Sequence, residues 1–209
     1  MGISIRHLHI EYPEQLLFKD VSFDVANDEL VAIRTEVLDG GTSLLKGIAG
    51  QLNGVDGSVL YEGVDLLDSP PSDIYFRIGF VYEEKGLLGI YNTEQNICLP
   101  LQFHSDLSDA EIHTAMQEVC ELLHIPQEQW SRKPHELNDV QMRMVNLARA
   151  LITRPGLLLI DELEGGMSDE YLVDTIQVLR ERQKHNPMAI IVTTASDVIT
   201  EMADRVYKI

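Results

Sequence analysis

Apolar and polar residues follow patterns along most of the chain that predict an alternation of strands and helices. In the first third, alternating positions and short apolar runs between turn residues predict strands. These strands cover residues 3–10, 21–25, 30–33, 58–61 and 78–82. Among them, apolar residues at helical spacing from Leu44 to Leu52 predict one short helix.

The middle of the chain has a helical pattern instead. Ser108 and Glu111 match a capping box, and the apolar stripe behind them predicts a helix that Pro126 ends. A second helix is predicted from about residue 140 to residue 152. We therefore expect a helical subdomain, about residues 92–151, to be inserted into the surrounding α/β core.

The last third returns to alternating strands and helices. The apolar runs at 157–160 and 189–192 are typical of parallel strands that are buried on both faces. Helices are predicted at 169–184 and 198–203, and a closing strand at 206–209. This alternation predicts an α/β fold, with the 209 residues forming one domain and its helical insertion.

Composition and charge narrow the possible partners. The chain has 34 acidic and 16 basic residues, a formal net charge of -18, which disfavours both nucleic acid and anionic lipid as partners. Two cysteines among 209 residues predict no disulfide framework, and no histidine or cysteine spacing suggests zinc. No apolar run has the length of a membrane span, so we expect a cytoplasmic chain without direct membrane insertion.

Two segments are candidates for chemistry. Residues 33–50 read as strand, glycine-containing loop and helix, the arrangement in which a phosphate-binding loop lies. Residues 157–160 form a buried strand that ends in Asp161 and Glu162, which can hold a hydrated magnesium ion and orient an attacking water. Each signal is weak alone, and their order and spacing together make the interpretation stronger.

The chain resembles, nearly from end to end, the nucleotide-binding subunit of ATP-binding-cassette (ABC) transporters. The resemblance implies an ABC-type P-loop NTPase fold with a mixed sheet core, ATP and Mg²⁺ as cofactors, and a homodimer or heterodimer bound to a membrane permease at the inner membrane. The segments 99–104 and 107–112 are also similar to the Mce-type phospholipid-trafficking branch. The matching stretches are Leu17–Phe23, Val31–Ile33, Ser43–Gly50, Ile78–Val81, Ala148–Leu151, Leu158–Glu162, Ile191–Thr193 and Ala203–Val206.

The phosphate loop departs from the family pattern G-x-x-G-x-G-K-S/T. An ungapped alignment places Thr35 and Leu38 at two glycine positions and Gly41 at the lysine position. Glycines let this loop turn its amides onto phosphates, and the lysine neutralises them. Glu36 and Asp39 add carboxylates, and two like charges 4 Å apart repel by roughly 4 kcal/mol at an effective dielectric near 20. We therefore expect ATP to bind weakly.

Three further motifs also depart from the family pattern at residues that serve nucleotide binding or hydrolysis. The Q-loop glutamine position holds Glu83, and the switch histidine position holds Thr194. In the signature LSGGQ, two glycines are replaced, although an asparagine there can still cap the following helix. The signature-like residues are Leu137, Asn138, Asp139, Val140 and Gln141.

Several residues nevertheless match the nucleotide site of the family. The resemblance implies that Tyr12 stacks on adenine, that Asp161 and the hydroxyls of Thr42 and Ser43 bind Mg²⁺, and that Glu162 is catalytic if the site is active. For Asp161 and Glu162 a structural role is favoured over catalysis, because the lysine is missing and a strand-end aspartate can satisfy backbone amides. The degenerate nucleotide site would comprise Tyr12, Gly40, Gly41, Thr42, Ser43, Glu83 and Asp161.

Three functions are compatible with these residues. The leading hypothesis is a catalytically silent ABC subunit that acts as a scaffold or regulator of a membrane transporter, with lipid as a candidate cargo. The alternatives are an active ATPase with an unusual site and a soluble partner-binding protein that reuses the fold. For the first two we expect the permease to bind the surface from Glu83 to Phe103, where residues 86–91 are unusually apolar.

Overall fold

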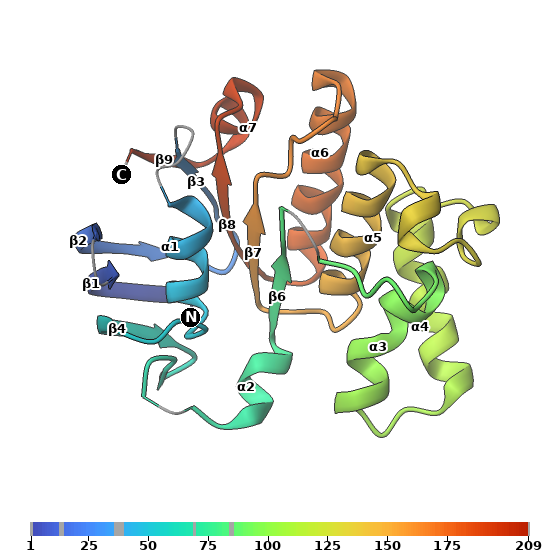
Figure 1. Ribbon diagram of the computed structural model, residues 1–209, viewed down its shortest axis with the longest axis horizontal. Helices are drawn as coiled ribbons and strands as arrows, with labels where there is room; N and C mark the ends of the chain where they lie inside the picture. The colour runs from blue at the N-terminus through green and yellow to red at the C-terminus, as the bar shows by residue number, and fades with distance from the viewer. Residues whose placement is uncertain (1, 13–14, 36–39, 69, 84–85, 209) are drawn as a thin grey trace.

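The strands form two sheets that lie side by side (Figure 1). The computed structural model describes residues 2–12, 15–35, 40–68, 70–83 and 86–208. The first sheet is antiparallel, in the order β2-β1-β4-β5. Its strands are β1 (Ile3–Tyr12), β2 (Gln15–Val25), β4 (Val55–Tyr61) and β5 (Val64–Asp65).

The second sheet is parallel throughout, in the order β6-β7-β8-β3-β9. The α/β prediction is confirmed, and parallel and antiparallel strands both occur, but they hydrogen-bond in separate sheets. This division keeps hairpin-connected strands apart from strands joined by helical crossovers. The strands are β3 (Leu30–Arg34), β6 (Ile78–Val81), β7 (Leu157–Asp161), β8 (Ala189–Thr194) and β9 (Arg205–Lys208).

Helices cover both faces of the parallel sheet. Helix α1 lies between the two sheets, whereas α5 and α6 lie beyond β7 on the other side (Figure 1). The chain between β6 and β7 contributes α3, α4, α5 and two short 3-10 turns. The helices are α1 (Gly41–Ile48), α2 (Ser72–Phe76), α3 (Thr93–His104), α4 (Asp109–Leu122), α5 (Asp139–Leu151), α6 (Asp169–His185) and α7 (Asp197–Met202).

The parallel sheet separates two apolar cores. Leu30 and Ala32 of β3 pack among the helices, whereas Val31 and Ile33 pack against α1 and the antiparallel sheet. Successive side chains of a strand point to opposite faces, so a strand between two cores must be apolar at every position. The uninterrupted apolar runs in the sequence follow from this burial.

Helix boundaries were predicted with unequal success. The capping box of α4 is confirmed, because the Glu111 amide donates to the Ser108 side chain and the Ser108 amide to the Glu111 carboxylate. The helix expected over residues 44–52 is displaced, since α1 begins at Gly41 and ends at Ile48. Gly40, whose left-handed φ of 81° ends the preceding loop, lets the helix begin early. Among the described residues, no helix is both long and apolar enough to cross a bilayer.

Candidate functional site

The start of α1 forms the first part of the candidate site. Gly41, Thr42 and Ser43 open the helix, with Gly40 as its N-cap, so their amides lie at the end of the helix that favours negative charge. The hydroxyl of Tyr12, at the end of β1, lies 3.3 Å from the Ser43 hydroxyl. The structure therefore brings these five predicted residues together.

The lysine position of the family lies in a closely packed place. A Cβ atom built on Gly41 would lie 3.1 Å from Cγ2 of Thr35 and 3.2 Å from Cβ of Thr193. Both distances are tighter than most Cβ contacts, so the threonines would have to shift by a few tenths of an ångström to admit a side chain at Gly41. Glu36, Leu38 and Asp39, whose carboxylates and stiffness were predicted to oppose phosphate binding, lie outside the described residues.

Asp161 lies at the end of β7 and is almost completely buried. One oxygen, Oδ1, accepts a 2.8 Å hydrogen bond from the Thr193 hydroxyl, and among the described residues Oδ2 has no partner. A hydrated Mg²⁺ suits such an unpaired oxygen and the nearby hydroxyl-bearing helix start. A triphosphate suits the site poorly, because none of the four residues from Gly40 to Ser43 carries a positive charge.

Glu162 follows Asp161 with a left-handed φ of 46°. Its amide donates to the Thr193 carbonyl at 3.1 Å, and its own carbonyl accepts from the Arg143 guanidinium on α5. Burial and the nearby carboxylates, with Glu83 first among them, raise the pKa of Glu162. Its side chain thus sits in an acidic environment that Arg143 offsets only in part.

Glu164 holds the loop that carries the switch position. Its Oε1 accepts from the Thr194 hydroxyl at 2.7 Å and from the amides of Ala195 and Ser196 at 2.8 Å and 3.3 Å. Thr194 is fully buried, so it presents no side chain to a ligand. The loop after β8 is therefore tied to the loop after β7 by contacts within the chain.

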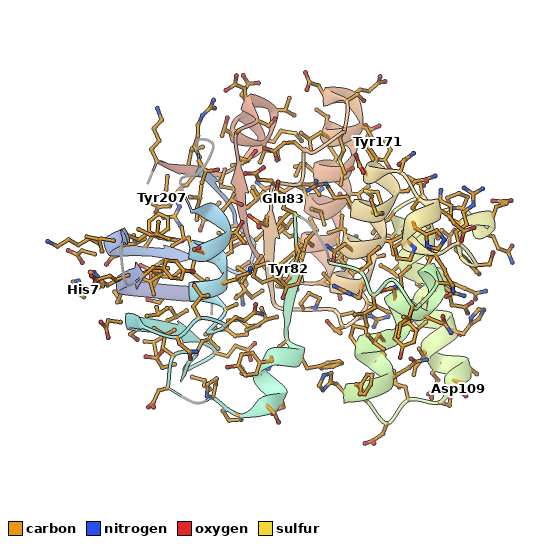
Figure 2. The ribbon with its side chains drawn as sticks, viewed as in Figure 1. His7, Tyr82, Glu83, Asp109, Tyr171 and Tyr207 are labelled. Carbon is orange, nitrogen blue, oxygen red and sulfur yellow. The ribbon has the colours of Figure 1, made fainter. Side chains whose placement is uncertain are left out.

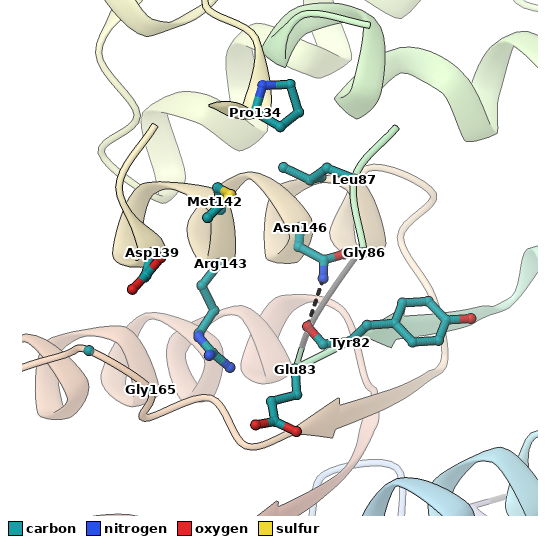
Figure 3. Close-up of a pocket in the computed structure, with 11 residues that line it drawn as sticks. Tyr82, Glu83, Gly86, Leu87, Pro134, Asp139, Met142, Arg143, Asn146 and Gly165 are labelled. Atoms are coloured by element: carbon teal, nitrogen blue, oxygen red, sulfur yellow. Dashed lines mark hydrogen bonds between the residues drawn. The ribbon is translucent and has the colours of Figure 1, made fainter. Parts of the chain in front are cut away.

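A cavity of about 570 Å³ opens between the loop after β6, the start of α5 and the loop after β7. Glu83 and the signature-like residue Asp139 both line it (Figure 3). Figure 2 shows Tyr82 and Glu83 at the carboxyl end of β6. Among the described residues, none of β1 or α1 lines this cavity, so Glu83 and Asp139 share it without the Tyr12 group.

The signature-like segment still caps the following helix but has no glycines at its centre. Asn138 caps α5, since its side chain accepts from the Gln141 amide at 2.8 Å, as predicted for this position. Leu137 is buried in the helical core, whereas Asp139 is exposed at the cavity. Val140 packs against that core and lies beside Gly166. The segment thus presents a carboxylate where the family has glycine.

Three residues of this region were not singled out from the sequence. Asn146 donates to the Tyr82 carbonyl at 3.0 Å (Figure 3), Arg143 binds the Glu162 carbonyl, and Glu164 holds the switch-position loop. Of the three, only Asn146 could have been noticed in the sequence, as a polar residue within an apolar helical pattern. It is buried in the structure, and buried polar side chains need hydrogen-bond partners. Arg143 and Glu164 carried no comparable signal.

Comparison with known proteins places the chain in a family. The profile described as "ABC transporter" matches residues 18–164. The putrescine transport ATP-binding protein PotG of Escherichia coli is 36% identical over 84% of this chain and 45% of its own length. The sulfate/thiosulfate import ATP-binding protein CysA of Burkholderia mallei is 30% identical over 99% of this chain and 59% of its own length. The chain belongs to the ABC transporter family.

Two further similarities bear on the extent of the chain. It spans about half the length of the relatives just named, but 96% of the putative hemin import ATP-binding protein HrtA of Staphylococcus epidermidis, to which it is 24% identical. The dimeric ATP-binding cassette MJ0796, bound to ADP and Pi, superimposes with a TM-score of 0.88 over 99% of this chain and 94% of its own. At 20% identity, that likeness establishes the fold alone.

Proposed function

We propose that this chain is an ABC transporter subunit that binds ATP weakly, does not hydrolyse it, and acts as a structural or regulatory partner of a membrane permease. The observation that carries the proposal is the packing at Gly41. Gly41, which aligns with the lysine position, carries no charge, and a Cβ atom built there would press closely on Thr35 and Thr193. A phosphate at this place would have helix amides but no cation.

The loops around the site support the same proposal. Glu164 satisfies the Thr194 hydroxyl and two amides of the loop after β8, so this loop holds its conformation without a nucleotide. Asp139 places a carboxylate on the segment that in the family faces a partner subunit's nucleotide. Either a homodimer or a heterodimer would therefore contain altered composite sites.

A permease partner is supported by exposed apolar side chains near the start of α3. Ile90 is 75% exposed and Leu88 is 45% exposed, which is unusual for large apolar residues outside an interface. The transported substrate is less well supported than the permease partner. The relatives named above are described as transporting putrescine, sulfate or thiosulfate, and hemin. We propose an import system, and a lipid cargo rests only on the segments 99–104 and 107–112.

The competing function is ATP hydrolysis at an unusual site. The unpaired oxygen of buried Asp161 and the neighbouring Glu162 favour it, because both residue types suit metal-assisted hydrolysis. The hydrogen bond from Thr193 to Asp161 argues against hydrolysis, because it gives this carboxylate a structural role that needs no nucleotide.

ATP binding and turnover distinguish the two functions. We expect millimolar Mg-ATP to leave the melting temperature almost unchanged, because a ligand stabilises by about 2.7 kcal/mol only at 100 times its Kd. Phosphate release should be measured on the purified chain and on its complex with the permease, with Glu162→Gln as the matched control. Turnover in the complex that Glu162→Gln abolishes would establish the active alternative.

A further inference from the structure

A groove of about 460 Å³ lies where the end of α4 meets α5 and α6, apart from the nucleotide-site residues and from the exposed apolar side chains near the start of α3. Its floor is apolar. Leu123 and Met144 are almost completely buried there, whereas Leu122 and Val178 are half-buried. The half-buried pair keeps apolar surface in contact with water until a partner covers the groove.

One wall of the groove is a stripe along α6. Its residues follow one another at intervals of three or four positions, so they share one face of the helix. The stripe covers a rise of about 15 Å, close to three helical turns. An apolar floor of this length suits the apolar face of a second helix. The stripe consists of Tyr171, Asp174, Val178 and Glu181, with Tyr171 near the start of α6 (Figure 2).

The charged groups along this stripe favour a cationic partner. Asp174 and Glu181 line the groove, and no lysine or arginine does. Glu181 already pairs with Lys184 at 2.6 Å. Among the described residues, Asp174 forms no ion pair and no side-chain hydrogen bond. Its carboxylate is therefore left to meet a charge that comes from outside the chain.

We propose that this groove binds a basic amphipathic helix of a partner protein, with apolar side chains over Leu122 and Val178 and a lysine or arginine on Asp174. The apolar floor supplies affinity, and the charge pair fixes the register of docking. A second copy of the chain fits poorly, because both copies carry a net charge of -18. Anionic lipid is repelled by the same carboxylates. The inference goes beyond the proposed function, because this surface needs neither nucleotide nor permease.

Helix α5 separates the groove from the cavity that Glu83 lines. Met144 faces the groove, whereas Arg143 and Asn146 line the cavity. Arg143 donates to the Glu162 carbonyl, and Asn146 donates to the Tyr82 carbonyl. A helix bound on Met144 would thus contact the element that holds the loops after β6 and β7, as a regulatory partner would.

Photo-cross-linking in the living host identifies the occupant. A photo-cross-linking amino acid replaces Gln177, an exposed residue that lines the groove, in the tagged full chain. The same replacement of Glu201, an exposed residue of α7 outside the groove, is the control. We expect position 177, and not position 201, to cross-link one protein segment. Mass spectrometry should identify this segment as an amphipathic helix with lysine or arginine on its polar face.

A synthetic peptide of the cross-linked segment tests the charge pair by fluorescence anisotropy. We expect Asp174→Lys to weaken binding at least tenfold at an unchanged melting temperature. Glu201→Lys makes the same change in net charge and should bind as the unmodified chain does. Replacing the basic residue of the peptide by glutamate should weaken binding to the unmodified chain and restore it to Asp174→Lys.

Several results would overturn the inference. They are a cross-linked second copy of the chain, a lipid adduct, a segment without a basic residue, and no cross-linked partner at position 177. Equal losses with Asp174→Lys and Glu201→Lys would also overturn it, because they would show attraction to net charge alone. If Asp174→Lys lowers the melting temperature, Asp174→Asn and Glu201→Gln provide the same comparison.

Discussion

Glu164 accepts a hydrogen bond of 2.7 Å from the hydroxyl of Thr194, the residue that we predicted at the switch position. The same carboxylate oxygen accepts from the amides of Ala195 and Ser196. The loop after β8 is thus held by an acidic residue of the same chain. The relationship links the ends of β7 and β8 directly.

Replacing this carboxylate should destabilise the fold measurably. We expect Glu164→Ala to lower the free energy of unfolding by about 2 kcal/mol, because three hydrogen bonds to one carboxylate oxygen are lost and the buried Thr194 hydroxyl loses its acceptor. Urea denaturation measures the change. Thr194→Ser, which keeps the hydroxyl, is the control, and a double-mutant cycle with Thr194→Val should give a positive coupling energy. Strict additivity would contradict the interaction.

Gly86 should tolerate no larger residue while Asn146 is present. A Cβ atom at Gly86 would collide with the Asn146 carboxamide, which its bond to Tyr82 holds in place. Gly86→Ala should therefore cost about 2 kcal/mol, and less in an Asn146→Ala background. Gly89→Ala is the matched control, because its Cβ would meet nothing within 4 Å. Equal costs of the two glycine substitutions in thermal denaturation would refute the contact.

The pH dependence of stability should carry a contribution from Glu162. Burial and neighbouring carboxylates raise the pKa of Glu162 in the folded state. The folded protein therefore loses stability as the pH rises from the ordinary glutamate pKa through the raised pKa of Glu162. Glu162→Gln should therefore melt higher than the unmodified chain at pH 7. The difference should vanish below the ordinary glutamate pKa, where both states are protonated. Glu128→Gln, which removes a carboxylate from an exposed turn, is the control for the loss of one negative charge.

Restoring nucleotide binding should require space as well as charge. We expect the combination of Leu38→Gly, Asp39→Ser and Gly41→Lys to bind Mg-ATP more tightly when Thr35→Gly is added, because the Thr35 methyl group lies close to a side chain at Gly41. Isothermal titration calorimetry measures the binding. Tight ATP binding by the unmodified chain would refute the proposed cause. An intact fourfold variant that still binds nothing would show that the remaining pocket is insufficient.

The sequence by itself determined the elements that follow from periodicity and capping. The uninterrupted apolar strands β3, β7 and β8 and the capped helices α4 and α5 were predicted because local pattern and burial agree there. The residues at the start of α1 were proposed as a nucleotide site from motif spacing next to a buried strand, and that role stays a prediction. The boundary of α1 was missed because a left-handed Gly40 begins the helix before its apolar stripe does.

Only the tertiary structure decided what surrounds the site. Thr35 and Thr193 are 158 residues apart in sequence, yet both crowd Gly41, because β3 and β8 are neighbours in the parallel sheet. Glu164 meets Thr194 for a similar reason, since β7 pairs with β8 and the following loops meet at one edge. Hydrogen bonds and packing between distant segments depend on the strand order of the sheet, and no local pattern encodes that order.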